Sequence, residues 1–413
     1  MNRIILLILS LLIANVSLYG KSYVRPEAFG AIGDGVTDDT KAIQKAILTE
    51  CPLLLENQYR ITQSLNLCND IYGSGTIIFG KNDVSIYCTN DGVSIEGLTF
   101  DFQFHEGKLL RIKGAKDINI SQCNFLNVGN HQAEQSIGII LITGASSNIR
   151  IEKCRFVKCY ASDKSSSAGV WVNFSNPEDR CHHIYIDRCY FDDFQPGKDA
   201  DAIKVLGQNE NVYMYVSNCE FRRCNKRALK FQARECYSKN NVIYVTRPMY
   251  CAIDFQRGNG ISKNDQIIID YDGISEINPN SGLLYRAVCI AQGNVKVINM
   301  DVKSINYIDN THQVAVCFQT FKDYDNGCVK DVRLKRCHFD GMSSFISAFP
   351  DLGSIHNLKV KNTVYHSRIK SYDIILRDKI MYDSTISYKG TGGSSLGIIK
   401  NNKFLEACII NKK

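Results

Sequence analysis

The fold is decided by the stretch Ile203-Lys204-Val205-Leu206, because the same four-residue pattern recurs along most of the chain. In almost every copy the first and third residues are large and apolar while the second and fourth vary, which is the two-residue alternation of a β-strand. The copies lie about 24 to 35 residues apart, a repeat length typical of solenoid proteins. The other copies are Leu110-Arg111-Ile112-Lys113, Ile140-Leu141-Ile142-Thr143, Val170-Trp171-Val172-Asn173, Leu229-Lys230-Phe231-Gln232, Ile253-Asp254-Phe255-Gln256, Val288-Cys289-Ile290-Ala291, Val316-Cys317-Phe318-Gln319 and Ile346-Ser347-Ala348-Phe349.

A second repeat lies between copies of the first and ends in the pattern Cys-x-Phe. The segment Ile118-Asn119-Ile120-Ser121-Gln122-Cys123-Asn124-Phe125 is one example, and Val93 to Phe100 is the same unit with Leu98 in the cysteine position. One repeat therefore holds at least two strands, and no helix-period pattern fits between repeats. The remaining Cys-x-Phe pairs are Cys154 with Phe156, Cys189 with Phe191, Cys219 with Phe221 and Cys337 with Phe339.

Stacked repeats of this kind place like residues above like, about 4.7–4.9 Å apart. A ladder of Phe and a ladder of Cys then fill the interior, and neighbouring rungs bury each other. The sequence predicts an all-β, single-stranded right-handed parallel β-helix. The outward columns of side chains form a surface on which chemistry can be placed.

The segment Phe29-Gly30-Ala31-Ile32-Gly33-Asp34-Gly35-Val36-Thr37-Asp38-Asp39-Thr40 precedes a short helical pattern that ends near Ile47. Thr37 or Asp38 is a good helix N-cap, and the apolar stripe that follows it predicts a helix covering the open end of the solenoid. Metal binding by the three aspartates of this segment is the alternative function.

This segment resembles the opening of the pectate-lyase-like superfamily, which includes polygalacturonases, rhamnogalacturonases, epimerases and phage tailspikes. Together with the rung repeats, the resemblance covers roughly residues 24–365. It implies the β-helix with a short N-terminal capping helix. It leaves the reaction open, because fold does not settle function. We expect a signal peptide at 1–20 and one β-helix domain at 21–413, with a cap at 27–48, rungs at about 53–365 and a C-terminal cap at 366–413.

The first twenty residues carry Arg3 followed by the apolar run Ile4 to Val16, which is typical of a secretory signal. At about 13–15 residues the run is short for a membrane anchor. We therefore expect a secreted or periplasmic protein with no membrane span after cleavage.

Seventeen cysteines in an exported chain raise the question of disulfides. Five of them recur at one inward rung position, where cysteine behaves as a small apolar residue, so we expect mostly buried free thiols. No zinc-ligand spacing is present, and we expect no cofactor. The alternative is calcium bound by Asp192, Asp193, Asp199 and Asp201, because carboxylate oxygens are calcium ligands.

The formal net charge is +7, and it falls by one when Arg3 is removed with the signal. In an exported protein this charge favours an anionic partner such as an acidic polysaccharide. Nucleic acid is disfavoured, because no aromatic and basic interleaving or recognition module is present. The sequence shows no subunit seam, so the oligomeric state is open.

Trp171, Lys204, Lys230 and Asp254 occupy one outward column on consecutive rungs. Lyases of acidic polysaccharides need positive charge at the uronate carboxylate, a base and a proton donor. Lys204 is expected roughly 5 Å from Lys230, and a like charge that close lowers a lysine pKa and favours a neutral base. Trp171 can stack on a sugar ring. The segments around Lys230 and Arg257 also resemble the β-helical lyases of the chondroitinase B and alginate lyase group, which implies Lys230 as base and Arg257 as acid or carboxylate clamp.

The stretch Asp199-Ala200-Asp201 resembles the first catalytic element of polygalacturonases, which hydrolyse with two acidic residues. One rung later the expected paired acids are replaced by Lys226-Arg227, and inverting hydrolysis needs two carboxylates about 6.5–9.5 Å apart. We place Asp199, Lys226 and Arg227, with Gln232 and Gln256, on the substrate-binding surface.

Three functions follow from these residues. The first is β-elimination of an acidic polysaccharide with Lys230 as base. The second is glycoside hydrolysis by Asp201 with Asp254, expected roughly 9–10 Å away across two rungs. The third is polysaccharide binding without catalysis, as in a tailspike-like surface protein. The same residues also have purely structural interpretations. Lys230 and Asp254 could form an exposed ion pair worth ~0–1 kcal/mol, and Asp199, Asp201 and Arg257 could occupy turn positions.

Overall fold

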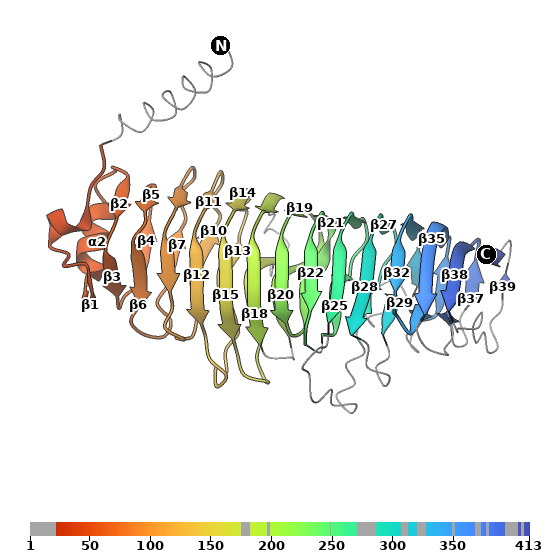
Figure 1. Ribbon diagram of the computed structural model, residues 1–413. Helices are drawn as coiled ribbons and strands as arrows, with labels where there is room; N and C mark the ends of the chain where they lie inside the picture. Colours follow the sequence, from red (N-terminus) through yellow and green to blue (C-terminus); the bar gives the residue numbers. More distant parts are fainter. Residues whose placement is uncertain are drawn as a thin grey trace, which may run out of the picture.

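The computed structural model is an elongated solenoid of parallel strands that winds from the capped N-terminal end to the C-terminus (Figure 1). It describes residues 22–174, 182–195, 199–247, 249–270, 286–306, 313–319, 328–348, 352–367, 373–376, 380–392, 404–405 and 409–413. The strands pair in register from one rung to the next, which confirms the right-handed parallel β-helix. The expected signal segment at 1–20 lies outside the described residues.

The N-terminal end is closed by the 3-10 helix η1 (Pro26–Phe29) and the helix α2 (Thr40–Ile47). The face of α2 that carries Ala42, Ile43, Ala46 and Ile47 is buried in the main core, as predicted. The aspartates of this segment bind backbone. Asp39 accepts hydrogen bonds from the N–H groups of Ile32 and Gly33, Asp34 accepts from Val36 and Thr37, and Asp38 accepts from Thr40 at the helix start. These contacts give the three carboxylates a structural role in holding the cap.

A typical rung contains three strands, and each of them pairs with its equivalents above and below. We call these stacks the first, second and third ladders, in the order in which the chain passes through them. The first ladder contains β4 (Leu65–Leu67), β7 (Ile86–Cys88), β10 (Lys108–Lys113), β13 (Ile137–Thr143), β16 (Ser167–Phe174), β19 (Ala200–Ser217), β21 (Arg227–Lys239), β23 (Cys251–Phe255), β26 (Arg286–Ile290), β29 (Val314–Phe318), β33 (Ser344–Ala348) and β36 (Ile374–Ile375).

The long strands β19 and β21 continue from the first ladder into the second. The other members of the second ladder are β2 (Leu53–Leu55), β5 (Ile71–Gly73), β8 (Ser94–Glu96), β11 (Asn119–Ser121), β14 (Ser147–Glu152), β17 (His182–Asp187), β24 (Ile261–Lys263), β27 (Lys296–Ile298), β31 (Arg333–Lys335), β35 (Lys359–Ser367), β38 (Thr385–Gly392) and β40 (Ile409–Lys412).

The third ladder begins at the N-terminal cap and ends by pairing with β35. It contains β1 (Asp34–Asp38), β3 (Gln58–Ile61), β6 (Thr76–Phe79), β9 (Thr99–Asp101), β12 (Asn124–Val128), β15 (Arg155–Tyr160), β18 (Tyr190–Gln195), β20 (Glu220–Cys224), β22 (Val242–Val245), β25 (Gln266–Asp270), β28 (Asp301–Asn306) and β32 (His338–Asp340). A short separate sheet near the C-terminus consists of β30 (Cys328–Lys330), β34 (Ser354–His356), β37 (Ile380–Tyr382) and β39 (Phe404–Leu405).

The interior is filled by the two predicted ladders. Phe100, Phe125, Phe156, Phe191 and Phe221 stack in sequence, with successive ring centroids 5.1, 4.9, 4.6 and 5.0 Å apart. The repeat cysteines lie buried beside them. Every cysteine in the described part of the chain is a free thiol, which agrees with the expected mostly free cysteines. Burial raises the pKa of the Cys224 and Cys236 thiols well above the ordinary value, as expected for cysteines that act as apolar filling.

Five alanines near the start of the central strands of the first ladder depart from strict alternation. Alternation predicts that Ala202, Ala228, Ala252, Ala287 and Ala315 point outward and form a flat floor. Instead they are fully buried in the main core, as are the residues directly after them, such as Ile203 and Leu229. Each of these rungs thus turns two consecutive residues inward. The positions that point away from the core, such as Asp201 and Lys204, are consequently three residues apart along the chain.

Candidate functional site

Two columns of outward side chains run across the middle of the first ladder. Backbone register makes Trp171, Lys204, Lys230 and Asp254 vertical neighbours, in the order expected from the sequence. A parallel column begins at Asp201, whose register partner one rung later is Arg227. These columns bring three acids and several cations into one cluster on the strands β16, β19, β21 and β23.

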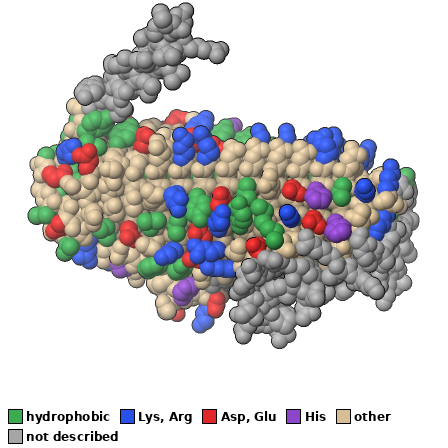
Figure 2. Space-filling model, in the orientation of Figure 1, with side chains coloured by type: hydrophobic (Ala, Val, Ile, Leu, Met, Phe, Trp, Pro, Cys, Tyr) green, Lys and Arg blue, Asp and Glu red, His purple; other side chains and the backbone are tan. Residues whose placement is uncertain are grey.

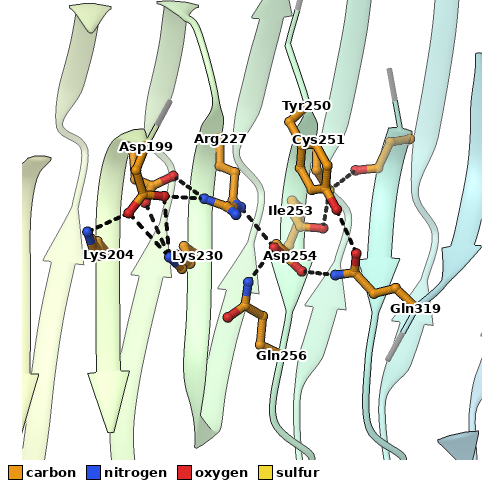
Figure 3. A network of polar contacts seen from close by, with 12 residues as sticks. Asp199, Lys204, Arg227, Lys230, Tyr250, Cys251, Ile253, Asp254, Gln256 and Gln319 are labelled. Carbon is orange, nitrogen blue, oxygen red and sulfur yellow. Dashed lines mark hydrogen bonds and ion pairs between the residues drawn. The ribbon is translucent and has the colours of Figure 1, made fainter. Parts of the chain in front are cut away.

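Asp199, just before β19, is surrounded by three cations of this cluster (Figure 3). Its carboxylate accepts hydrogen bonds from Lys204 Nζ at 2.7 Å and from Arg227 Nη1 at 2.8 Å. Lys230 Nζ approaches the same carboxylate less closely, at 3.3 and 3.5 Å from its two oxygens. The Asp199 side chain remains 25% exposed, against 5% for Lys204, 8% for Arg227 and 11% for Lys230. Asp199 is therefore the most accessible member of the cluster.

Arg227 connects the three carboxylates. The Nη1 atom that binds Asp199 also donates to Asp201 Oδ1 at 2.9 Å, and Nε donates to Asp254 Oδ2 at 2.8 Å. Asp201 and Asp254 are both completely buried. A buried ion pair is strongly destabilised when one partner is removed, so Arg227 is the structural centre of the site as well as part of its surface.

Asp254 is held by amide groups in addition to Arg227. Gln256 Nε2 donates to Asp254 Oδ2 at 2.8 Å, and Gln319 Nε2 donates to Oδ1 at 2.8 Å. The Tyr250 hydroxyl donates in turn to Gln319 Oε1 at 2.8 Å. Three donors and complete burial fix the Asp254 carboxylate in the wall of the site.

The Tyr250 ring lies beside three cations. Lys226 Nζ is 4.7 Å from its centroid, the Arg286 guanidinium carbon is 4.4 Å away and the Arg227 guanidinium carbon is 5.3 Å away. Such cation–π contacts are worth about 0.5–2 kcal/mol each, more when they are desolvated. Tyr250 also packs on a small apolar cluster outside the main core, formed by Cys251, Cys289, Val314 and Cys317. This tyrosine thus anchors the C-terminal side of the site.

The pKa values of Asp199, just before β19, and Asp201, within β19, are shifted in opposite directions. Burial works to raise the pKa of Asp199, but the positive charges of Lys230, Lys204 and Arg227 outweigh it and hold that pKa below its usual range. Burial raises the pKa of Asp201, and Arg227 only partly offsets this effect while the negative charge of Asp199 adds to it. Burial and the nearby Arg227 lower the pKa of Lys226. Pairs of acids whose pKa values are pushed apart are typical of acid–base sites.

The structure brings most of the predicted site residues together but changes their pairing. Lys230 and Asp254 are register partners, yet each forms its ion pairs with other residues: Lys230 with Asp199 and, at 4.0 Å, with Asp201, and Asp254 with Arg227. The alternative of an exposed Lys230–Asp254 ion pair is replaced by these contacts, because the long Arg227 side chain reaches Asp254 from the neighbouring column.

Four predicted residues lie at the edges of the cluster. Trp171 is half-buried with Lys204 Nζ 4.9 Å from its ring, and its Nε1 is buried without a hydrogen-bond partner among the described residues. Gln256 supports Asp254, as described above. Gln232 is half-buried two residues beyond Lys230 on β21. Arg257 is largely buried in the turn that follows β23.

Sequence reasoning missed Tyr250, Arg286 and Gln319. Arg286 lies two residues before the inward Val288, just as Asp201 and Arg227 lie two residues before inward apolar residues. It therefore extends the column that runs from Asp201 through Arg227 and Cys251. Aligning the repeats on that position would have found it. Gln319 ends a recognised repeat but contacts Asp254 from two rungs away, which only the register reveals.

The alternative calcium site is not assembled by these side chains. Asp192 is bound by Arg223 Nε at 2.7 Å, and Asp193 by Arg247 Nη1 at 2.9 Å. Among the described residues, no group of three or more acidic, histidine or cysteine side chains is arranged to hold a metal ion. The same part of the chain also contains no helix with the length and apolarity needed to cross a membrane.

The fold and the site define the class of structure: a right-handed parallel β-helix with a largely buried cluster of charges on the outer side of its first ladder. No protein-family model matches the chain. A capsule-specific depolymerase of Klebsiella phage K64-1 is 27% identical over 275 residues, which cover 59% of this chain and 31% of the depolymerase. The chain thus matches about a third of the length of that relative.

Solved structures with the same fold include a tailspike protein of E. coli bacteriophage HK620, crystallised as a variant in complex with a hexasaccharide. It superimposes with a TM-score of 0.66 at 12% identity, over 91% of this chain and 80% of the tailspike. The surface adhesin PfbA of Streptococcus pneumoniae gives a TM-score of 0.55 at 15% identity, over 91% of both chains. At these identities the likeness to the solved structures concerns the fold alone.

Proposed function

We propose that this protein depolymerises an acidic, uronate-containing polysaccharide at the cluster around Asp199, by β-elimination. The observation that carries the proposal is the charge of the cluster. Six cationic residues (Lys204, Lys226, Arg227, Lys230, Arg257 and Arg286) gather with three acidic ones (Asp199, Asp201 and Asp254) on neighbouring rungs. An excess of buried or half-buried positive charge favours an anionic ligand.

Substrate binding begins with an exchange of carboxylates. Asp199 is the exposed acid of the cluster and is bound by Lys204, Arg227 and Lys230. A uronate carboxylate has the same charge and shape, so it can replace Asp199 as the partner of these cations. Positive charge at that carboxylate stabilises the carbanion-like transition state that forms when the adjacent proton is removed.

Lys230 is the base in this mechanism. Of the three cations bound to Asp199, it has the longest contacts and the greatest exposure, so it is the one most easily released. Its own proton must leave first. Asp201 Oδ2 lies 4.0 Å from Lys230 Nζ, has no hydrogen-bond partner among the described residues, and belongs to a carboxyl group whose pKa burial raises. Asp201 is therefore suited to accept that proton.

The elimination then proceeds with conserved atoms and charge. Lys230 takes the proton next to the uronate carboxylate, the electron pair forms the new double bond, and the bond to the 4-linked sugar breaks. The departing oxygen takes a proton from a water molecule, with Arg257 as the positively charged side chain proposed to lie near it and stabilise it. Trp171, Gln232 and Gln256 line the proposed path of the sugar chain.

A panel of uronate polymers tests the proposal, read by near-ultraviolet absorbance of the unsaturated product and by new reducing ends. Lys230→Ala is expected to abolish both signals while leaving the thermal unfolding curve in place. Lys113→Ala, which removes an exposed lysine at the end of β10 in the same ladder, is the matched control and should retain activity. Full activity of Lys230→Ala would exclude Lys230 as the base.

A second reaction is favoured by the opposite pKa shifts of the two aspartates: glycoside hydrolysis with Asp201 as acid and Asp199 as its ionised partner. Both Oδ1 atoms bind the same Arg227 nitrogen, at 2.8 and 2.9 Å. The two carboxylates are therefore closer than the about 6.5–9.5 Å of inverting enzymes and nearer the about 5–5.5 Å of retaining ones. Reducing ends without the unsaturated product, lost in both Asp199→Asn and Asp201→Asn, would establish hydrolysis.

The pair Asp201 and Asp254 is less suited to hydrolysis. Arg227 binds both carboxylates at once and occupies the space between them, and both are fully buried. An inverting mechanism needs a water molecule in that space. Polysaccharide binding without turnover remains the outcome if neither product appears while binding to the polymer is retained.

We also propose that the protein is exported and works without a metal cofactor. The signal-like stretch at 1–20 motivates the first part, and mass spectrometry of the mature N-terminus tests it; an intact Met1 would contradict cleavage. In this mechanism Lys204, Arg227 and Lys230 neutralise the uronate carboxylate, a role that a calcium ion could otherwise fill. We therefore expect activity to be retained in the presence of EDTA. Loss of activity with EDTA and its return with calcium would contradict this part.

A further inference from the structure

The outer surface of the second ladder changes its charge along the solenoid. In the C-terminal half, two adjacent columns of this ladder carry seven cationic side chains on five consecutive rungs and no acidic one. We call this surface the basic face. Its cations are Lys239, Lys263, Lys296, Arg333, Lys335, Lys359 and Lys361.

The same two columns have a different composition in the N-terminal half. There they carry Glu96, Glu152 and Asp187, with Arg150 as the cation and Tyr185, Tyr215 and Tyr237 as a stacked ladder of rings. The strands of both halves pair in the same parallel register. The concentration of positive charge in the C-terminal half is thus a property of the side chains alone, and it is a large part of the net charge of +7.

The cations of the basic face are available to a partner. Lys239, Lys263, Arg333, Lys335 and Lys361 are exposed, and Lys296 and Lys359 are half-buried. None of the seven forms an ion pair with an acidic side chain in the described part of the chain. The acids at the neighbouring turns have partners of another kind: Glu235 accepts a hydrogen bond from Asn259 at 2.7 Å, and Asp331 accepts one from Asn357. Figure 2 shows Lys and Arg side chains recurring along the upper edge of the C-terminal half.

We propose that the basic face is a second binding surface for a linear acidic polysaccharide, separate from the cluster around Asp199. Its cations recur with the rung spacing of about 4.8 Å, along a straight and flat sheet surface that matches an extended chain with regularly repeated negative charges. A ladder of asparagine amides (Asn240, Asn264 and Asn299), hydrogen-bonded in series at 3.0 and 2.9 Å, borders the face. Amides beside cations suit a polymer that carries hydroxyl groups as well as carboxylates.

Other polyanions fit less well. On these five rungs the remaining side chains of the two columns are Tyr237, Ile261 and Ile298. One aromatic ring therefore lies at the N-terminal end of the face, and the four following rungs carry none of the stacking platforms of single-stranded nucleic-acid sites. A flat sheet also inserts nothing into the groove of a duplex. The acidic nature of the polymer rests on the proposed function, whereas the surface itself does not depend on catalysis.

The test uses the full chain and polygalacturonate as the probe. A triple variant, Lys263→Glu with Lys335→Glu and Lys361→Glu, reverses three exposed cations of one column. The control variant makes the same change in net charge with exposed lysines outside both surfaces: Lys41→Glu, Lys81→Glu and Lys116→Glu. Affinity is measured at several salt concentrations, because contacts between exposed charges weaken as salt screens them.

We expect the triple variant to lose about tenfold or more in affinity at low salt and the control variant to change by less than about twofold. Cleavage of short oligosaccharides that occupy only the Asp199 cluster should be unchanged in the triple variant. Equal affinity of the two variants would overturn the proposal, as would wild-type binding to duplex DNA or anionic vesicles but not to polygalacturonate. Because the readout is binding, a chain that cleaves no polymer still tests the basic face, and Lys230→Ala should bind normally.

Discussion

The Asp199 cluster and the basic face both stack lysines and arginines on neighbouring strands. The repulsion between these cations is offset in a different way in each region. In the cluster, Lys204, Arg227 and Lys230 are nearly buried and share the carboxylate of Asp199. On the basic face the cations are mostly exposed and rely on water and salt. The same repeating backbone therefore carries both a preorganised site and a solvated docking surface, and burial decides which one results.

The largest difference between the two regions is expected in stability. Arg227→Ala leaves Asp201 and Asp254 buried without their shared cation, and breaking a buried ion pair in this way costs about 3–5 kcal/mol. Arg333→Ala on the basic face should change the free energy of unfolding by less than about 0.5 kcal/mol. Urea denaturation of both variants measures the contrast. Similar free energies of unfolding for the two would show that the charges of the cluster are solvated after all.

A smaller and pH-dependent difference should follow from Asp199→Asn. The pKa of Asp199 is lower in the folded protein than its unfolded value of about 3.9. Ionised Asp199 therefore stabilises the fold above that value, and its contribution is lost as the pH falls through the folded pKa. The stability gap between wild type and Asp199→Asn should be full near neutral pH and shrink below about pH 4. A gap that stays constant down to pH 2 would contradict the ion-pair role.

The smallest effect is expected from the triple charge reversal of the basic face, measured as stability instead of binding. Reversal at position 263 places an opposite charge beside Lys239, whereas reversal at both 335 and 361 keeps like charges stacked. These effects oppose each other, so Lys263→Glu with Lys335→Glu and Lys361→Glu should leave the melting temperature nearly unchanged at low salt. The difference should disappear at high salt, because exposed charges are screened. A clear loss of stability at low salt would mean that these lysines have structural partners.

Much of this architecture can be predicted from the residues. The alternating repeats predict the strands. The Cys-x-Phe pattern predicts the buried ladders of Cys and Phe, because parallel rungs stack equivalent positions. The column of Trp171, Lys204, Lys230 and Asp254 followed from the same repeat and has the register that was expected. The pairing within the site did not follow, because long side chains such as Arg227 reach across columns.

The wrong orientation predicted for the alanines and the missed second outward column have the same physical origin. Strict alternation placed Ala202 and Ala228 outward, whereas the rung turns two consecutive residues into the core. This double inward turn has no strong residue signature in the sequence. It also moves Asp201 and Arg227 into a second outward column, next to the first, so that Asp199 and Asp254 can share a cation.

The sequence by itself determined the β-helix, its N-terminal cap and the order of charged residues along the rungs, because these depend on local periodicity and on equivalent positions repeating. Only the tertiary structure decided which cations are buried around Asp199 and which remain in water on the basic face. That choice depends on how neighbouring columns and the ring of Tyr250 exclude solvent, and solvent exclusion is a property of the stacked solenoid and not of any one rung.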